Sequence, residues 1–151
     1  MQTRFLCPFH RYWLNNHPEF ARSHFYQCLG ATQHHRKYQA WSQAVVYAGG
    51  AFEAAEILLN RNPHTLYPII SFTSAAILLS STLDELNNND RSLHILHLCY
   101  QRLNKELMAE DNTRLKTLFK CIALISERMR AFWQDKGSAT PSALPVNATR
   151  H

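Results

Sequence analysis

The chain has 151 residues, of which 46% are hydrophobic and 18% are charged, and its formal net charge is +5. These values are typical of one soluble globular domain with a sizeable core, and they exclude an intrinsically disordered chain. The longest mostly apolar stretch, residues 66–79, is shorter than the roughly 20 residues needed to cross a bilayer. Since the N-terminus also lacks the apolar core of a secretory signal, we expect a cytoplasmic protein with no membrane association.

The N-terminal region is rich in aromatic residues and is interrupted by two prolines. A short helix is predicted over residues 3–14. A second helix is predicted to start at Pro18, because proline fits the first turn of a helix, and to end at Gly30, because glycine readily adopts the left-handed cap. Residues 34–37 are then predicted to form a polar connector or an irregular helix start.

Four seams of apolar residues follow, with spacings that alternate between three and four residues. They cover residues 41–58, 69–86, 93–107 and 115–132. This spacing is what helices need when they lie side by side and interlock along one stripe. The sequence therefore predicts an all-α fold, an antiparallel up-down bundle of four long helices preceded by one or two short N-terminal helices.

The predicted bundle occupies residues 1–136 as a single domain. From Gly137 onward the sequence has small residues, two prolines and no helical period. Such a composition predicts a disordered C-terminal tail over residues 137–151.

Two adjacent glycines, Gly49 and Gly50, lie in the middle of the first long helix. Each glycine costs a helix about 1 kcal/mol relative to alanine. Either another part of the chain packs tightly against this site, or the helix bends or breaks there. Close by, Glu53 and Glu56 share a helix face, which we interpret as a solvated acidic face.

The helix predicted over residues 66–87 carries serine and threonine where lysine and glutamate are usual on an exposed face. Such a helix is either central in the bundle or covered by another subunit, and we expect a homodimer. The predicted contact surface combines this helix with the aromatic N-terminal segment. It consists of Phe9, Tyr12, Trp13, Ser71, Ser74 and Ser81.

Motifs for catalysis are missing from the sequence: it has no nucleophile elbow, no glycine-rich phosphate loop and no di-iron Glu-x-x-His motif. We therefore expect no enzyme activity, no catalytic residues, no resident metal and no cofactor. His94 and His97 are the alternative metal ligands, because residues three apart share a helix face, but they need partners from another helix.

The predicted function is that of a non-catalytic cytoplasmic protein that binds other proteins, as an adaptor, a small regulator or an export-type chaperone. One alternative is a nucleic-acid-binding regulator, because arginines such as Arg11, Arg22 and Arg36 alternate with aromatic residues. Nucleic acid is not favoured, because the basic residues of the last helix do not share one face. A metal- or haem-binding sensor bundle is the other alternative, based on the nine histidines.

Overall fold

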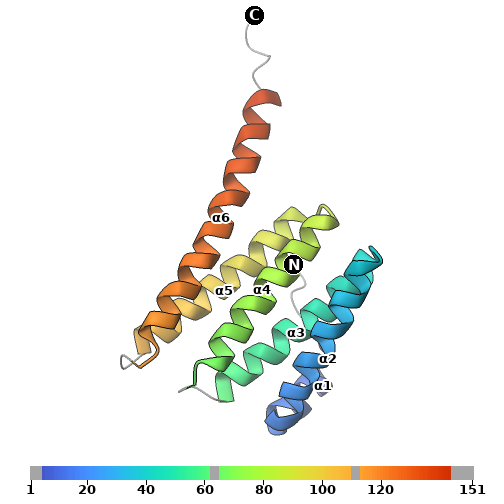
Figure 1. Cartoon of the computed structure of the whole chain (residues 1–151), viewed down its shortest axis with the longest axis vertical. Helices are drawn as coiled ribbons and strands as arrows, with labels where there is room; N and C mark the ends of the chain where they lie inside the picture. The colour runs from blue at the N-terminus through green and yellow to red at the C-terminus, as the bar shows by residue number, and fades with distance from the viewer. Residues whose placement is uncertain (1–4, 62–64, 110–112, 144–151) are drawn as a thin grey trace, which may run out of the picture.

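The computed structural model describes residues 5–61, 65–109 and 113–143, with side chains up to Asp135 (Figure 1). All regular elements within these ranges are α-helices, and none of these residues forms a strand, so the all-α prediction is confirmed. None of the described helices is both long enough and apolar enough to cross a membrane.

Six helices make up the described chain. They are α1 (Pro8–Asn16), α2 (Pro18–Lys37), α3 (Trp41–Arg61), α4 (Tyr67–Glu85), α5 (Asn89–Ala109) and α6 (Leu115–Ala143). The helix α1 is short, and the other five have between 19 and 29 residues. The described chain therefore has five long helices, one more than the sequence predicts.

The additional long helix is α2, which passes through Gly30 and ends at Lys37. The predicted end at Gly30 is wrong, and residues 34–37 form the last helical turn instead of a connector or a helix start. The largest helix–helix contact in the fold is between α2 and α3, and Thr32 is fully buried on the last turns of α2. Burial beyond the glycine offsets its intrinsic helix cost.

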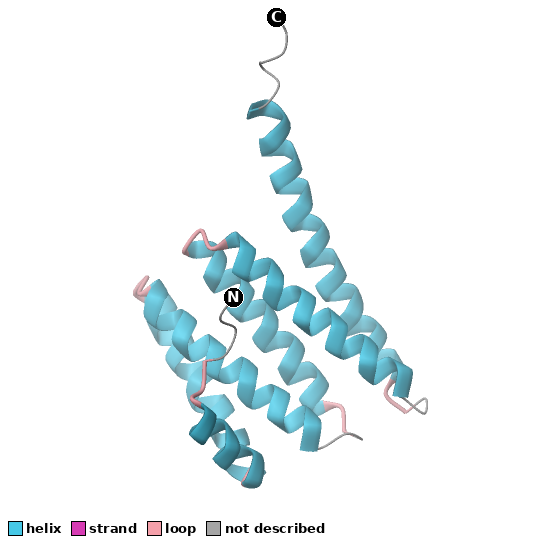
Figure 2. Cartoon of the chain, turned by 180° about the vertical axis from the view of Figure 1, so that it is seen from behind, coloured by secondary structure: helices cyan, strands magenta, loops and turns pink. Residues whose placement is uncertain are grey.

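The long helices pack in chain order, α2 on α3, α3 on α4, α4 on α5 and α5 on α6, with a further contact between α4 and α6. Among the described residues, α3 and α6 share no substantial contact, so the helices form an open row that does not close into a ring. The helices α2, α4 and α6 lie towards the viewer in Figure 1, whereas α3 and α5 lie towards the viewer in Figure 2.

The most central helix is α4, because it packs on α3, α5 and α6. Polar residues on this helix are buried and have hydrogen-bond partners within the chain: the hydroxyl of Thr73, for example, donates to the carbonyl of Ile69 at 2.8 Å. The first of the two alternatives for this helix is therefore correct. Most of its uncharged polar residues, namely Ser71, Thr73, Ser80 and Thr82, are covered by the protein's own helices.

The paired glycines lie inside an unbroken α3, so the alternative of a helix break is wrong. A β-carbon on Gly49 would lie 2.0 Å from Cγ of Phe5, and one on Gly50 would lie 2.9 Å from Sγ of Cys28. Both distances are too short for real atoms. The glycines are there because the N-terminal segment and α2 pack directly on the backbone of α3.

The last helix, α6, continues past Lys136 to Ala143, so helical structure extends beyond the predicted start of the tail. Extending an existing helix costs far less than starting one, so α6 can continue into residues that have no apolar seam. Residues 144–151 of the predicted tail lie outside the described residues. Figure 1 shows the C-terminal part of α6 projecting beyond the other helices.

Candidate functional site

A groove between α3 and α5 is the leading candidate for a binding site. It has a volume of about 280 Å³, and α4 forms its floor. Its apolar residues are Phe52, Phe72 and Leu98, and its polar walls are Glu53, Glu56, Gln101, Arg102 and Lys105. Phe52 and Phe72 stack with their ring centroids 5.0 Å apart, which gives the groove a rigid aromatic base.

The N-terminal segment, residues 5–7, lies beside this groove and joins the same two helices. The ring of Phe5 rests on Gly49 of α3, and the guanidinium carbon of Arg91 on α5 lies 4.7 Å from the centroid of that ring. Leu6 is buried in the core. In Figure 2 this segment crosses the face of the row that is turned towards the viewer, before α1 begins.

Glu53 holds the backbone of this segment. Its carboxylate accepts hydrogen bonds from the backbone N–H of Phe5 at 2.6 Å and from that of Leu6 at 2.9 Å, and its side chain is only 1% exposed. Arg11 completes the arrangement: its Nε lies 3.7 Å from the carboxylate, and its Nη2 donates to the carbonyl of Leu6 at 2.8 Å. The interpretation of Glu53 as part of a solvated face is wrong.

These hydrogen bonds compensate the burial of the Glu53 carboxylate and give the N–H groups of Phe5 and Leu6 an acceptor. A buried carboxylate is costly unless it is paired and hydrogen-bonded, and the backbone N–H groups of a non-helical segment need acceptors. The side chains of Glu53 and Arg11 thus bind both the donors and an acceptor of the backbone around Leu6. The fold therefore contains an example of a non-helical chain segment bound at the end of the α3–α5 groove.

The α5 wall of the groove is fixed by an ion-pair network. Arg102 donates to Oε2 of Glu106 at 2.8 Å, and the buried Arg114 donates to Oε1 at 3.0 Å. Burial on its own would raise the pKa of Glu106, but the hydrogen bonds from the two arginines outweigh it, so the pKa is lowered. Glu106 is thus held as a carboxylate that orients Arg102 along the groove wall.

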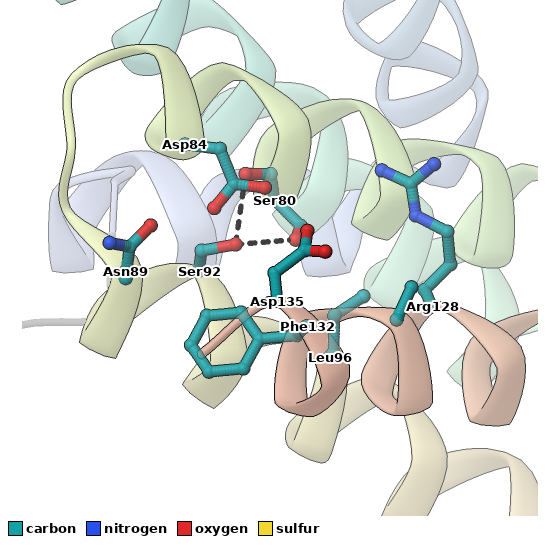
Figure 3. Close-up of a pocket in the computed structure, with 9 residues that line it drawn as sticks. Ser80, Asp84, Asn89, Ser92, Leu96, Arg128, Phe132 and Asp135 are labelled. Atoms are coloured by element: carbon teal, nitrogen blue, oxygen red, sulfur yellow. Dashed lines mark hydrogen bonds between the residues drawn. The ribbon is translucent and has the colours of Figure 1, made fainter. Parts of the chain in front are cut away.

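A second cavity of about 380 Å³ opens where α6 departs from α4 and α5 (Figure 3). The hydroxyls of Ser80 and Ser92 lie 2.7 Å apart, and that of Ser92 donates to the backbone carbonyl of Ser80 at 3.0 Å. Asp84 and Asp135 also line this cavity, with Arg128 at its other end in this view. Through these hydrogen bonds the serine pair joins α4 to α5.

The six predicted interface residues do not form one surface. Phe9 and Tyr12 on α1 are 77% and 69% exposed, and Trp13 is partly exposed. The serines lie on α4, which has no substantial contact with α1 among the described residues. Ser71 is buried, Ser74 is exposed, and Ser81 is half-buried with its hydroxyl donating to the carbonyl of Leu78 at 3.0 Å. The buried Ser71 is unable to contact a partner, because the chain's own helices cover that side of α4.

Of the exposed aromatic residues on α1, Trp13 joins a cluster at the corner between α1 and α2. Trp13 stacks on His17 with centroids 4.3 Å apart, and Phe20 lies 5.1 Å from Trp13. Sequence reasoning missed Phe20. The sequence feature that could have identified Phe20 is the helix start at Pro18. It places Phe20 in the first turn of α2, next to the last turn of α1.

The histidines do not assemble a metal site in the described part of the chain. His94 is half-buried and His97 is exposed, and no three described histidine, cysteine or acidic side chains converge as metal ligands. A different pair was missed: the rings of His10 on α1 and His24 on α2 lie 5.0 Å apart. Burial, with the nearby His10 as a second cause, lowers the pKa of His24.

Several arginines that suggested nucleic-acid binding contact other side chains of the fold, although Arg22 stays exposed. The guanidinium of Arg22 lies 4.7 Å from the centroid of the Tyr67 ring, and Arg36 donates to the hydroxyl of Thr82 at 2.7 Å. Arg114 is buried. These contacts reduce the basic surface that remains for a polyanion.

Comparisons with known proteins complete the description of the site. No model of a known protein family matches the chain, and neither the curated proteins nor the solved structures show significant similarity to it.

Proposed function

We propose that this chain is a non-catalytic cytoplasmic protein that binds other proteins, as an adaptor, small regulator or export-type chaperone. Its ligand is an extended segment of the partner, which lies in the groove between α3 and α5. The observation that carries this proposal is the binding of the protein's own residues Phe5 and Leu6 at the end of that groove, through Glu53 and Gly49.

The composition of the open part of the groove suits a peptide. The apolar lining of the groove suits one side chain of the ligand, because Leu98 is half-buried whereas Phe52 and Phe72 are buried. Gln101 and Lys105 on the α5 wall supply hydrogen-bond donors, and Gln101 also supplies an acceptor, for the backbone of an extended chain. A bound peptide would thus be recognised in the same way as the N-terminal segment, by a buried side chain and by polar groups that bind the backbone.

The test is a selection from a random peptide library against the full-length protein, followed by measurement of the affinity of selected peptides by fluorescence polarisation. Gln101→Trp places a large ring across the groove and is expected to weaken binding at least about 100-fold. Gln33→Trp makes the same change at an exposed position of α2, away from the groove, and should bind like the unaltered protein. Peptides that bind Gln101→Trp as tightly as Gln33→Trp would contradict the proposal, as would a selection that yields no binder.

A further inference from the structure

The outer face of α6 also has the features of a binding surface, separate from the groove. We propose that it joins two copies of this chain in a twofold-symmetric dimer, with the two α6 helices packed antiparallel. The sequence suggested a homodimer contact on α4. Because the chain's own helices cover most of α4, we place the contact on α6 instead. This inference does not depend on the function proposed for the groove.

Only one side of α6 is used in the fold. Leu118, Cys121 and Ile125 are buried against the neighbouring helices α4 and α5. Figures 1 and 2 show α6 at one edge of the row, with no described helix on its far side. The opposite face is therefore a helix surface of this chain that no described element covers.

The exposed face has a shallow, open depression of about 410 Å³. Its four lining residues are Lys120, Ala123, Leu124 and Glu127, at positions i, i+3, i+4 and i+7. Four residues with this spacing form the hole that receives a side chain of a facing helix in knobs-into-holes packing. The small Ala123 lets a second helix approach closely, and Leu124 is 54% exposed, available as the side chain that enters the hole of the other copy.

The same four residues are symmetric about the point midway between Ala123 and Leu124. Lys120 and Glu127 each lie 3.5 residues, or about 5 Å along the helix, from that point. When two copies pack antiparallel around it, each Lys120 meets Glu127 of the other copy, and each Ala123 meets the other copy's Leu124. A parallel pair would instead place like charges opposite each other, so the charge pattern selects the antiparallel arrangement.

Glu127 also forms an ion pair with Arg130 on the same helix. Both side chains are more than half exposed, and an exposed pair of this kind contributes little to stability. It does not prevent the contact between copies, because a carboxylate accepts several hydrogen bonds. Lys120 of the second copy would join Glu127 and Arg130 in one alternating charge cluster.

The experiment uses charge reversal on the full-length protein, with the dissociation constant measured by sedimentation equilibrium. Lys120→Glu and Glu127→Lys each place like charges opposite each other twice in the dimer, and each is expected to weaken self-association at least about tenfold. An equimolar mixture of the two variants restores both attractive pairs. It should therefore form a heterodimer at least as tight as the unaltered dimer.

Lys37→Glu on α2 is the matched control, because it makes the same charge change at an exposed position far along the chain from α6. It should leave the dissociation constant within about twofold of the original. Both reversal positions are exposed, so circular dichroism should show unchanged helix content. The proposal is overturned if the protein is monomeric up to about 1 mM. A dimer that tolerates both reversals, or a mixture that associates no better than either variant alone, would also overturn it.

Discussion

Phe5 occupies the space that a β-carbon on Gly49 would need, with Cγ of its ring 2.0 Å from the position of that atom. An N-terminal residue and a residue in the middle of α3 are therefore matched to each other across 44 positions of the sequence. The match extends to the next turn of the helix, where Glu53 accepts the backbone N–H groups of Phe5 and Leu6. One helix face thus supplies both the space for the ring and the acceptor for the backbone.

Replacing Gly49 by alanine should expel the Phe5 ring. We expect the free energy of unfolding to fall by about 1–3 kcal/mol, despite the higher helix propensity of alanine, because a tightly packed site is overfilled. Gly30→Ala is the control, since a β-carbon there meets no atom within 4 Å and the residue lies inside α2. That change should stabilise the protein by about 0.5–1 kcal/mol. Urea unfolding of both variants measures the difference, and equal effects at the two sites would contradict this account.

Glu53→Gln should release the N-terminal segment. The amide offers one acceptor oxygen in place of two and leaves Arg11 beside a neutral group, so we expect a loss of about 2–4 kcal/mol in the free energy of unfolding. Hydrogen exchange at the amides of Phe5 and Leu6 should accelerate more than exchange in α4. Glu85→Gln, at an exposed position, should stay within about 0.5 kcal/mol of the unaltered protein. Unchanged protection of Phe5 and Leu6 in Glu53→Gln would show that this carboxylate does not hold the segment.

Acid should weaken the contact between α1 and α2 through His24. The pKa of His24 in the folded protein lies below its ordinary value of 6.5, chiefly because the side chain is partly buried and secondarily because of His10. Protonation therefore favours the unfolded state: the stability is fully present above pH 6.5 and is lost as the pH falls through the lowered pKa. Between pH 7.5 and 5.5 we expect the free energy of unfolding to decrease, and to decrease less in His24→Gln. Parallel pH profiles for the two proteins would argue against this role.

The four cysteines should differ sharply in reactivity. Cys7 is exposed, whereas Cys28, Cys99 and Cys121 are buried. Burial raises the pKa of Cys28 to about 11, which lowers its thiolate fraction at neutral pH about 100-fold relative to an ordinary thiol. Titration of the native protein with a thiol reagent at pH 8 should therefore show one fast-reacting group, and Cys7→Ser should remove it. A second fast group in the native protein would contradict the burial of the other three.

The sequence predicted the helices well where apolar residues repeat, as in the seams that contain Leu79, Leu103 and Ile125, all fully buried. The predicted helix end at Gly30 was wrong. The low helix propensity of glycine favours an end there, but the packing of the following turns on α3 keeps α2 helical to Lys37. The order of packing was also not predictable. Apolar seams show which face of a helix is buried, but they do not say which other helix covers it.

The candidate groove could not be predicted from the sequence either, because it also depends on which distant parts of the chain come together. Glu53 and Glu56 look alike on the helix face, and only the arrival of the N-terminal segment from 47 residues away buries the first of them. The glycine pair was the one local signal of this contact. It indicated that another part of the chain packs closely on α3, but it did not identify that part as Phe5.

The bridge from Phe5 to Arg91 has a consequence for synthesis of the chain. Residues 5 and 6 are translated before α5, and the guanidinium that covers the Phe5 ring belongs to Arg91 on α5, which is translated 86 residues later. At ordinary translation rates this interval lasts roughly 4–17 s. During that time the nascent segment around Phe5 lacks the Arg91 side chain, so the ring face that Arg91 later covers stays open.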